Sequence, residues 1–579
     1  MADSGVSVLP IDRRAGQGHR DRRAHRGITL STLVVIEIVL AVGLGAWAAS
    51  GSPLGWIALA VAGVASLTLI PVRGHRSLVG RWSQRMGFVW ARARRPSADL
   101  TPPSFDIPAS PSPAGNSSVR SGAGNDTIGA RWVEDTLITV LRVAPAGPAV
   151  TYLTPGRSAV ADTAGQVVPL AALAECINPF DIRLDSIEII SHGVRSWGGG
   201  PIAQTYHRTL GPLAATAHRS VLVVLRLNPL DCADAVARRG GGAVGALRTA
   251  TITTRRVAKR LSESGLRVSI LSGAEITSVT GQLAEGAPLD DMTEDWDSIA
   301  SGQLRFRSAA IDPAALAHVL GSVWVNSALS TTATVRLRHD AGGELEVSGL
   351  IRFAELPSAG RTADPLPEGL RALEGHQFDA LAASLPIAVP GRLDRTLPSL
   401  HGVEAEQLLR TLTVPASGCG QLVGADHGGR AVAVPLVGPD VRSVAIAAGP
   451  QVVAQVTLRA VAIGAAVTVH TVRPDRWQHL IGTVGDLRRL ALSSDRVQTP
   501  AGHRVTIFDG LTGPPPEPNT THITVLAAGD PRVGELVPDA AVVLRQDPRA
   551  PQDISITTAN ERVAVTMVAT PDEWNYIGR

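Results

Sequence analysis

The apolar positions near the start of the chain form two long, nearly uninterrupted runs. Residues 28–49 and 54–72 contain hardly any charged side chains, and only Ser50-Gly51-Ser52-Pro53 separates them. At about 1.5 Å per helical residue the runs would be roughly 33 and 28 Å long, close to the ~30 Å thickness of a bilayer's hydrocarbon core. The pattern therefore predicts two transmembrane helices joined as a tight hairpin.

Beyond residue 127 the pattern changes to short β-branched runs that alternate with amphipathic stretches, as in α/β proteins. The predicted fold class is α/β: an N-terminal transmembrane helical hairpin (28–72) followed by two cytosolic α/β domains, at 128–389 and 390–579. In the first domain, strands are predicted at 136–143, 220–227, 267–271, 332–338 and 344–353, with helices at 245–264 and 368–384. In the second, the clearest strand–helix–strand unit is predicted at 442–447, 450–463 and 465–471, then a short helix at 477–480 and strands at 504–508, 522–526, 540–545, 553–557 and 562–568.

Charge predicts the orientation of the hairpin. The chain of 579 residues has 54 Lys+Arg and 51 Asp+Glu, but the first hundred residues hold thirteen arginines against five acids. These arginines flank the two apolar runs on both sides, whereas the connection between the runs is uncharged. By the positive-inside rule both flanks are cytoplasmic, which predicts a multi-pass inner-membrane protein with cytoplasmic N- and C-termini. A cleaved signal peptide is the alternative, but the first run is longer than a signal peptide's apolar region and a second run follows at once.

Three segments around the hairpin have distinct compositions: a basic tail at 1–27, a basic amphipathic helix at 73–95, and a Pro/Ser-rich linker at 96–127. In the amphipathic helix, Trp82 and Trp90 are predicted to anchor in the membrane interface. The arginines predicted to contact anionic lipid are Arg76, Arg81, Arg85 and Arg92. The alternative is a solvated connector helix with an ordinary apolar stripe.

Glu37 is an acidic residue inside the first apolar run. A charged carboxylate at that depth costs about 2.5–3.5 kcal/mol on insertion scales, so the side chain is expected to face protein. In a hairpin centred on residues 51 and 52, Glu37 lies at the depth of Ser66. Two hypotheses follow: a protonated Glu37 that bonds to Ser66, or a polar contact with another membrane subunit.

Searches for catalytic and cofactor motifs exclude most enzyme classes. The three cysteines, Cys176, Cys232 and Cys419, are too few and too far apart for a disulfide framework or a zinc site. The single lysine, Lys259, lies in no phosphate-binding motif. Residues 240–245 fit the pattern G-x-G-x-x-G, beside Arg238 and Arg239, but the predicted strand ends a dozen residues earlier, where a nucleotide site needs a tight turn.

Two further features leave an enzymatic alternative open. The turn at 448–451 occupies the place of a phosphate loop but lacks a lysine and a glycine cradle, so at most it marks a degenerate nucleotide sensor. Residues 290–297 are strongly acidic, and Asp295 with Asp297 could hold a divalent cation in a membrane-anchored, metal-dependent glycosyltransferase-like enzyme. The simpler interpretation is a solvated acidic loop. Nucleic acid is not an expected partner, because residues 101–579 are net acidic.

Several whole segments resemble the EccE family, a membrane component of the type VII (ESX) secretion systems of actinobacteria. They are the hairpin, GALRTATITTRRVAKRLSESGLRVSIL (245–271), Trp296 with WVNSALSTTATVRLR (324–338), GCGQLVGADHGGRAVAVPLVGP (418–439) and LRAVAIGAAVTVHTVRPDRWQHLI (458–481). The resemblance implies a non-catalytic accessory subunit that supports the assembly or stability of the export machinery, with no cofactor, no metal ion and no catalytic residue. The implied partners are the EccB-, EccC- and EccD-like inner-membrane subunits and an associated membrane-bound subtilisin-like protease.

Overall fold

The structure is a computed structural model, and it divides into two compact units, Met1–Arg95 and Pro96–Arg579. The residues that the structure describes are 30–50, 53–69, 85–86, 88, 101–108, 120–121, 127–160, 165–178, 180–340, 342–356, 365–387, 393, 397–494, 503–517, 519–531, 533 and 537–578.

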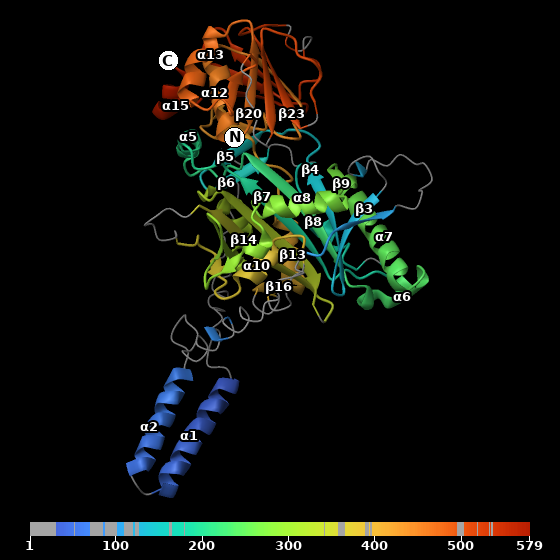
Figure 1. Cartoon of the computed structure of the whole chain (residues 1–579), viewed down its shortest axis with the longest axis vertical. Coiled ribbons are helices and arrows are strands. Elements are labelled where there is room, and N and C mark those ends of the chain that lie inside the picture. The colour runs from blue at the N-terminus through green and yellow to red at the C-terminus, as the bar shows by residue number, and fades with distance from the viewer. Residues whose placement is uncertain are drawn as a thin grey trace, which may run out of the picture. The chain divides into compact units, whose positions relative to one another are not determined.

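In the first unit, α1 (Leu30–Ser50) and α2 (Pro53–Leu69) pack against each other as a hairpin (Figure 1). Near the connection, the rings of Trp47 and Trp56 meet edge to face, with centroids 5.5 Å apart. Several large apolar side chains of the hairpin face outward, namely Ile38, Val42, Leu44, Trp56, Ile57 and Val61. Among the residues described, no helix combines the length and the apolar character needed to cross a membrane.

The second unit contains two large sheets. Sheet A has fourteen strands, and the neighbours along its main path are antiparallel. In spatial order that path is β1 (Phe105–Pro108), β3 (Thr127–Val133), β4 (Thr136–Ala144), β8 (His218–Leu227), β7 (Ser186–Val194), β13 (Ser330–His339), β14 (Leu345–Glu355), β12 (Leu304–Ile311), β11 (Ile299–Ser301) and β10 (Thr293–Glu294). Off the path lie β2 (Arg120–Ser121), β9 (Arg267–Ile270), β15 (Leu370–Ala372) and β16 (Ser399–His401).

Helices cover both faces of sheet A. One face packs into the largest apolar core beneath α4 (Leu170–Ala174), α7 (Gly242–Glu263), α9 (Leu316–Ser322) and α11 (Gly402–Thr411). The other face lies beneath α8 (Gly273–Leu283) and α10 (Gln377–Ala383). Helix α6 (Ala233–Arg238) follows the 3-10 helix η2 (Pro229–Cys232) and packs against α7. Because both faces are buried, successive side chains of a central strand enter two different cores.

The strands predicted at 220–227 and 267–271, and the helix predicted between them at 245–264, are present as β8, β9 and α7. Strands β8 and β9 are joined through α7, as expected, but they do not pair with each other. Both pair antiparallel with β4, so β4 lies between them. The prediction for residues 368–384 is partly wrong: β15 and α10 replace one continuous helix, because Gly375 adopts a left-handed φ of 72° between them.

Sheet B has twelve strands, of which six consecutive ones are parallel. In spatial order the twelve strands are β21 (Leu490–Leu492), β20 (Ala466–Thr471), β22 (Arg504–Asp509), β23 (Thr520–Leu526), β19 (Ser443–Ala447), β24 (Val542–Asp547), β25 (Ala550–Thr557), β26 (Arg562–Met567), β17 (Gln421–Ala425), β18 (Ala431–Val434), β5 (Thr151–Thr154) and β6 (Arg157–Val160). The parallel ones are the first six, from β21 to β24. The associated helices are α5 (Pro201–Leu210), α12 (Pro450–Ala462), α13 (Asp475–Val484) and α15 (Pro571–Ile577). The predicted unit β19–α12–β20 is present, with β22 and β23 between its two strands.

The two sheets exchange segments of the chain. Strands β5 and β6 leave sheet A after β4 and join sheet B, and α5 packs on α12 and α15. In the other direction, β16 and α11 follow residue 389 but belong to sheet A. A division into domains at residues 389 and 390 therefore stays a prediction. Within the predicted linker, β1 pairs with β3, which brings the folded part of the chain forward to about residue 101.

Candidate functional site

The predicted membrane-contact residues are described only in part. Glu37 is exposed on α1, whereas Ser66 is buried on α2, and its Oγ has no hydrogen-bond partner among the residues described. The Glu37–Ser66 bond is thus not formed in this hairpin. Arg85 is exposed. Five predicted residues lie outside the described part of the chain: Arg76, Arg81, Trp82, Trp90 and Arg92.

The glycine-rich segment at 240–245 packs two helices together. A side chain at Gly245 would place its Cβ 2.3 Å from the carbonyl oxygen of Val236, so the glycine allows α6 and α7 to approach closely. Both neighbouring arginines are paired with Asp181, at 2.9 Å for Arg238 and 2.8 Å for Arg239. These hydrogen bonds, that of Arg239 foremost, hold the pKa of Asp181 well below its ordinary value. Neither guanidinium is therefore available for a phosphate without breaking this contact.

The acidic run at 290–297 does not converge on one point. Glu294 is buried and accepts a hydrogen bond from the backbone N–H of Phe378 at 2.8 Å. Asp297 is exposed and pairs with Arg305 at 3.3 Å, and Asp295 is exposed as well. Among the residues described, no group of three or more His, Cys, Asp or Glu side chains is arranged to hold a metal ion. No observation supports the glycosyltransferase alternative.

The turn between β19 and α12 is closed to phosphate. A phosphate loop presents free backbone N–H groups at the start of a helix. Here the N–H of Gly449 donates to Oε1 of Gln546 at 2.6 Å, and Pro450, the first residue of α12, has no N–H. Gly449 and Pro450 therefore offer no free backbone N–H to a nucleotide.

A network that the sequence did not reveal lies at the carboxyl end of the parallel strands, the usual location of ligand sites in such sheets. Asp509, fully buried at the end of β22, accepts hydrogen bonds from Thr471 at 2.9 Å and from the Trp477 indole at 3.1 Å. Arg473 and Arg476 pair with the same carboxylate, at 2.5 and 3.5 Å. All four partners belong to one local segment, so Asp509 fixes the start of α13 to the sheet and is already fully engaged.

Thr332, His192 and Glu285 form a second buried cluster. Their side chains follow one another in the order of a catalytic triad, but a substrate cannot reach them. Nδ1 of His192 lies 2.9 Å from the hydroxyl of Thr332, and its Nε2 lies 3.4 Å from Glu285. Burial lowers the pKa of His192 to about 3 and raises the pKa of Glu285. A hydroxyl, an imidazole and a carboxylate in series could activate a nucleophile. Thr332, however, is only 1% exposed, so the cluster stabilises sheet A and cannot meet a substrate.

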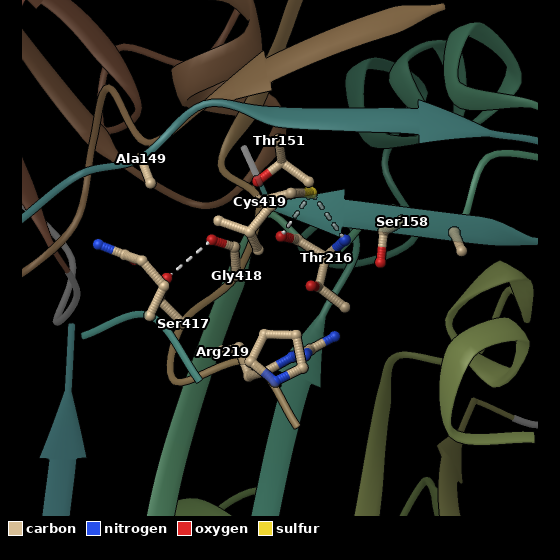
Figure 2. Close-up of a pocket in the computed structure, with 12 residues that line it drawn as sticks. Ala149, Thr151, Ser158, Thr216, Arg219, Ser417, Gly418 and Cys419 are labelled. Atoms are coloured by element: carbon tan, nitrogen blue, oxygen red, sulfur yellow. Dashed lines mark hydrogen bonds between the residues drawn. The ribbon is translucent and has the colours of Figure 1, made fainter. Parts of the chain in front are cut away.

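The cavity shown in Figure 2 lies where strands of the two sheets meet. It is lined by Thr151 and Ser158 from sheet B, by Thr216 and Arg219 at the start of β8, and by the segment around Cys419. The Cys419 thiol accepts from the Thr216 N–H and donates to its carbonyl oxygen, both at 3.2 Å.

The volume of this cavity is about 10 Å³, room for roughly one water molecule. Burial raises the pKa of Cys419, which keeps the thiol neutral and weakly nucleophilic. At Gly418 an added Cβ would lie 2.6 Å from the carbonyl oxygen of Thr216. The Gly-Cys-Gly sequence therefore serves close packing between the sheets.

Several buried polar groups of the second unit bind segments of the fold to each other. Arg459 on α12 and Glu573 on α15 form a two-pronged ion pair at 2.6 and 2.8 Å, both fully buried. Perturbed groups in clefts suggest catalysis, but ion-pair networks inside a fold perturb pKa values equally. The geometry favours scaffolding over chemistry.

Comparisons with known proteins indicate one family. A family model described as "Putative type VII ESX secretion system translocon, EccE" matches residues 215–311, the region from just before β8 to the end of β12. The ESX-5 secretion system protein EccE5 of Mycobacterium marinum is 30% identical over 284 residues, which cover 46% of this chain and 66% of the relative. EccE1 of the ESX-1 system of Mycolicibacterium smegmatis is 25% identical, covering 60% and 69%, and EccE2 of the ESX-2 system of Mycobacterium tuberculosis is 24% identical, covering 61% and 63%.

The alignments thus span between 63% and 69% of the length of these relatives. The family model and the relatives agree with the segments that carry the resemblance in the sequence, above all residues 245–271 on α7 and β9. The chain is therefore similar to EccE proteins of type VII secretion systems, and residues 215–311 match the model of that family.

Proposed function

We propose that this protein is a non-catalytic structural subunit of a type VII (ESX) secretion complex in the inner membrane. The observation that carries the proposal is the match to the EccE family, because the relatives are named as secretion system proteins of ESX-1, ESX-2 and ESX-5. The geometry of the second unit supports a role without catalysis, since its buried carboxylates, imidazoles and thiols contact one another or the backbone.

The proposed attachment to the membrane is the helical hairpin. It is supported by the apolar side chains that face outward from α1 and α2, such as Ile38, Val42, Trp56 and Val61. Such side chains are unfavourable in water and favourable in lipid. The arginines on both sides of the hairpin support cytoplasmic termini and contact with anionic lipid through Arg76, Arg81, Arg85 and Arg92.

The proposed partners follow from the family: EccB-, EccC- and EccD-like subunits of the same complex and its subtilisin-like protease. Within the hairpin, the exposed carboxylate of Glu37 is the proposed polar contact to a neighbouring membrane subunit. A Glu37→Leu variant should still insert but should co-purify with fewer subunits, whereas Glu37→Gln, which keeps hydrogen bonding, should assemble normally. Equal recovery of subunits with Leu and with Gln would remove this contact from the proposal.

Deletion and complementation test the structural role. Deleting the gene should abolish export of the system's substrates and reduce the yield of the tagged, detergent-solubilised complex. Complementation with Asp295→Ala/Asp297→Ala should restore export fully. Both carboxylates are exposed, and among the described residues they belong to no group of side chains that could hold a metal ion. Normal export without the protein would refute the proposal, and loss of export in the double variant with the complex intact would favour an enzyme.

A further inference from the structure

The outward face of α7 is unusually basic. Its side chains away from the core include Arg248, Ile252, Arg255 and Lys259, spaced so that they lie along one side of the helix. Helix α7 lies at the outer margin of sheet A, with α6 beside it (Figure 1). We call this surface, together with Arg256, the α7 basic face.

The cations at the two ends of this region are paired with carboxylates, whereas Arg255 and Lys259 in the middle of α7 have no such partner among the residues described. Beside the first turn of α7, on α6, Arg238 and Arg239 bind Asp181, and at the last turn Arg260 binds Glu175 at 2.8 Å and lies 4.0 Å from Glu263. Between them, Arg255 and Lys259 have no carboxylate partner among the residues described. Arg255 and Lys259 therefore carry positive charge that is not balanced by a carboxylate of the described residues.

Exposed apolar side chains border the same face. Phe180 is 92% exposed, and its ring lies beneath the guanidinium of Arg256 at 5.3 Å. Phe180 also has a φ of 60°, a left-handed conformation that is unfavourable for an aromatic residue and is found mainly where function requires it. Val244 and Ile252 on α7, and Leu230 on the preceding η2, are 54%, 38% and 70% exposed.

We propose that the α7 basic face docks on the anionic lipid surface of the membrane, as a second contact in addition to the hairpin. Arginine and lysine side chains would lie against lipid phosphates, while Phe180 and Val244 enter the interfacial region. Basic residues interspersed with exposed apolar ones are the combination that binds anionic bilayers. The inference rests on the proposed membrane attachment of the hairpin.

Two observations favour lipid over an acidic protein segment. Two surface grooves of the second unit, each of about 400 Å³, are lined by residues of other elements and do not include the α7 basic face. A partner helix that docks through its apolar face uses such a groove, whereas a bilayer needs only an accessible face. Residues 70–100 connect α2 to the described residues before β1, and a chain of that length spans at most roughly 110 Å. This length allows α7 to reach the leaflet into which the hairpin would insert.

The test uses the full chain in lipid nanodiscs. All three natural cysteines are buried, so Val244→Cys can be labelled selectively with the fluorophore NBD, whose emission shifts to the blue in lipid. Discs of neutral phosphatidylcholine are compared with discs containing 30% phosphatidylglycerol. We expect a blue shift, and quenching by lipid-bound spin labels, only in the anionic discs.

Removing positive charge from the α7 basic face tests the proposal quantitatively. Neutralising Arg255 and Lys259 to Gln should lower the ratio of docked to free α7 by about 30-fold. Each cation near anionic lipid contributes about 1 kcal/mol, and about 1.4 kcal/mol corresponds to a tenfold change. The matched control is Arg410→Gln/Arg488→Gln, two exposed cations on other elements, which should leave the NBD signal unchanged.

The outcomes separate this inference from the proposed function. If the chain is extracted from bilayers by alkaline carbonate, the hairpin proposal fails. If the chain stays inserted but NBD emission is the same in neutral and anionic discs, α7 docking is refuted and the hairpin stands. A blue shift that is unaffected by neutralising Arg255 and Lys259, or that arises only with the other complex subunits in neutral discs, would overturn lipid as the partner.

Discussion

The two faces of sheet A are built from the same strands but differ in chemistry. Strand β8 shows the contrast most clearly. From Val221 onward, every side chain that β8 turns toward α7 is apolar, namely Val221, Val223, Leu225 and Leu227. Arg219, near the start of the strand, stacks on Trp324. Toward α8 and α10 the strand contributes Leu222, Val224 and then Arg226, which forms a two-pronged ion pair with Glu188 of β7, with both contacts at 2.9 Å.

The charged face continues across the sheet. Arg336 of β13 lies 3.5 Å from the same Glu188 carboxylate, and Arg226 also donates to the carbonyl oxygens of Leu385 and Ile387 after α10. A slip of one residue in strand pairing would move every one of these charges into the apolar face. We infer that the apolar face supplies most of the stability, whereas the charged face fixes the register of β7, β8 and β13.

The largest loss of stability should come from removing Glu188, the carboxylate shared by the arginines of the charged face. Glu188→Ala leaves the guanidiniums of Arg226 and Arg336 buried without their shared carboxylate, which should lower the free energy of unfolding by about 3–5 kcal/mol. Urea denaturation of the purified chain, followed by circular dichroism, measures this loss. The double variant Glu188→Leu/Arg226→Met should recover most of it. If the single variant changes stability by less than 1 kcal/mol, the pair does not hold the strands.

On the apolar face, a substitution should lower the free energy of unfolding only through lost packing. Leu141 of β4 is fully buried toward α7, so Leu141→Ala should leave a cavity and cost about 2–4 kcal/mol. Unlike Glu188→Ala, this variant should show no rescue by any neighbouring charge change, and its effect should not depend on salt. A salt-dependent loss would contradict the division between the two faces.

The parallel half of sheet B and the charged strands of sheet A also differ in how well the sequence predicts them. In sheet B the apolar runs at 442–447 and 465–471 enclose a helix, and the prediction of β19, α12 and β20 is confirmed. In sheet A, β7 and β12 were not predicted, because SIEIISHGV and LRFRSAAI mix charged with apolar residues in a way typical of an exposed segment. Their charges find partners only on distant strands, which local patterns cannot reveal.

The candidate site shows the same limit. Sequence alone identified residues 240–245, 290–297 and 448–451 as places where phosphate or metal could bind, each with a simpler alternative. It did not predict that Asp181 occupies Arg238 and Arg239, or that Asp509 gathers Thr471, Trp477 and two arginines. These contacts join residues more than thirty positions apart, so they depend on the tertiary fold.

A titratable group at the start of β8 should make the stability depend on pH. Burial, followed by the charge of His503, lowers the pKa of His218 to about 4. His503, bonded to Thr521 at 2.7 Å, has a lowered pKa as well, again mainly through burial. Below pH ~6.5 the unfolded chain therefore binds protons that the native chain does not, so the stability falls as the pH drops toward 4.

Between pH 7 and pH 5 we expect His218 to account for a loss of about 1–2 kcal/mol. Urea midpoints measured across this range should fall on acidification, and His218→Gln should flatten the curve. The matched control is His427→Gln on the hairpin turn between β17 and β18, which should leave the slope unchanged. A slope that persists in His218→Gln would assign the effect to other groups.

The smallest loss of stability should come from breaking an exposed ion pair, that of Asp297 with Arg305. It contrasts with the buried pair of Glu188 and Arg226. Asp297 and Arg305 lie 3.3 Å apart, but the side chains are 55% and 31% exposed, so water screens the attraction. Asp297→Asn should therefore change the free energy of unfolding by less than about 0.5 kcal/mol, roughly a tenth of the effect of Glu188→Ala. The same variant, dialysed against Mn²⁺ and compared with the parent chain by calorimetry, should show no difference in metal binding. A clear loss of Mn²⁺ affinity in Asp297→Asn would mean that the acidic run at 290–297 binds metal after all, and that this edge of sheet A has a function beyond packing.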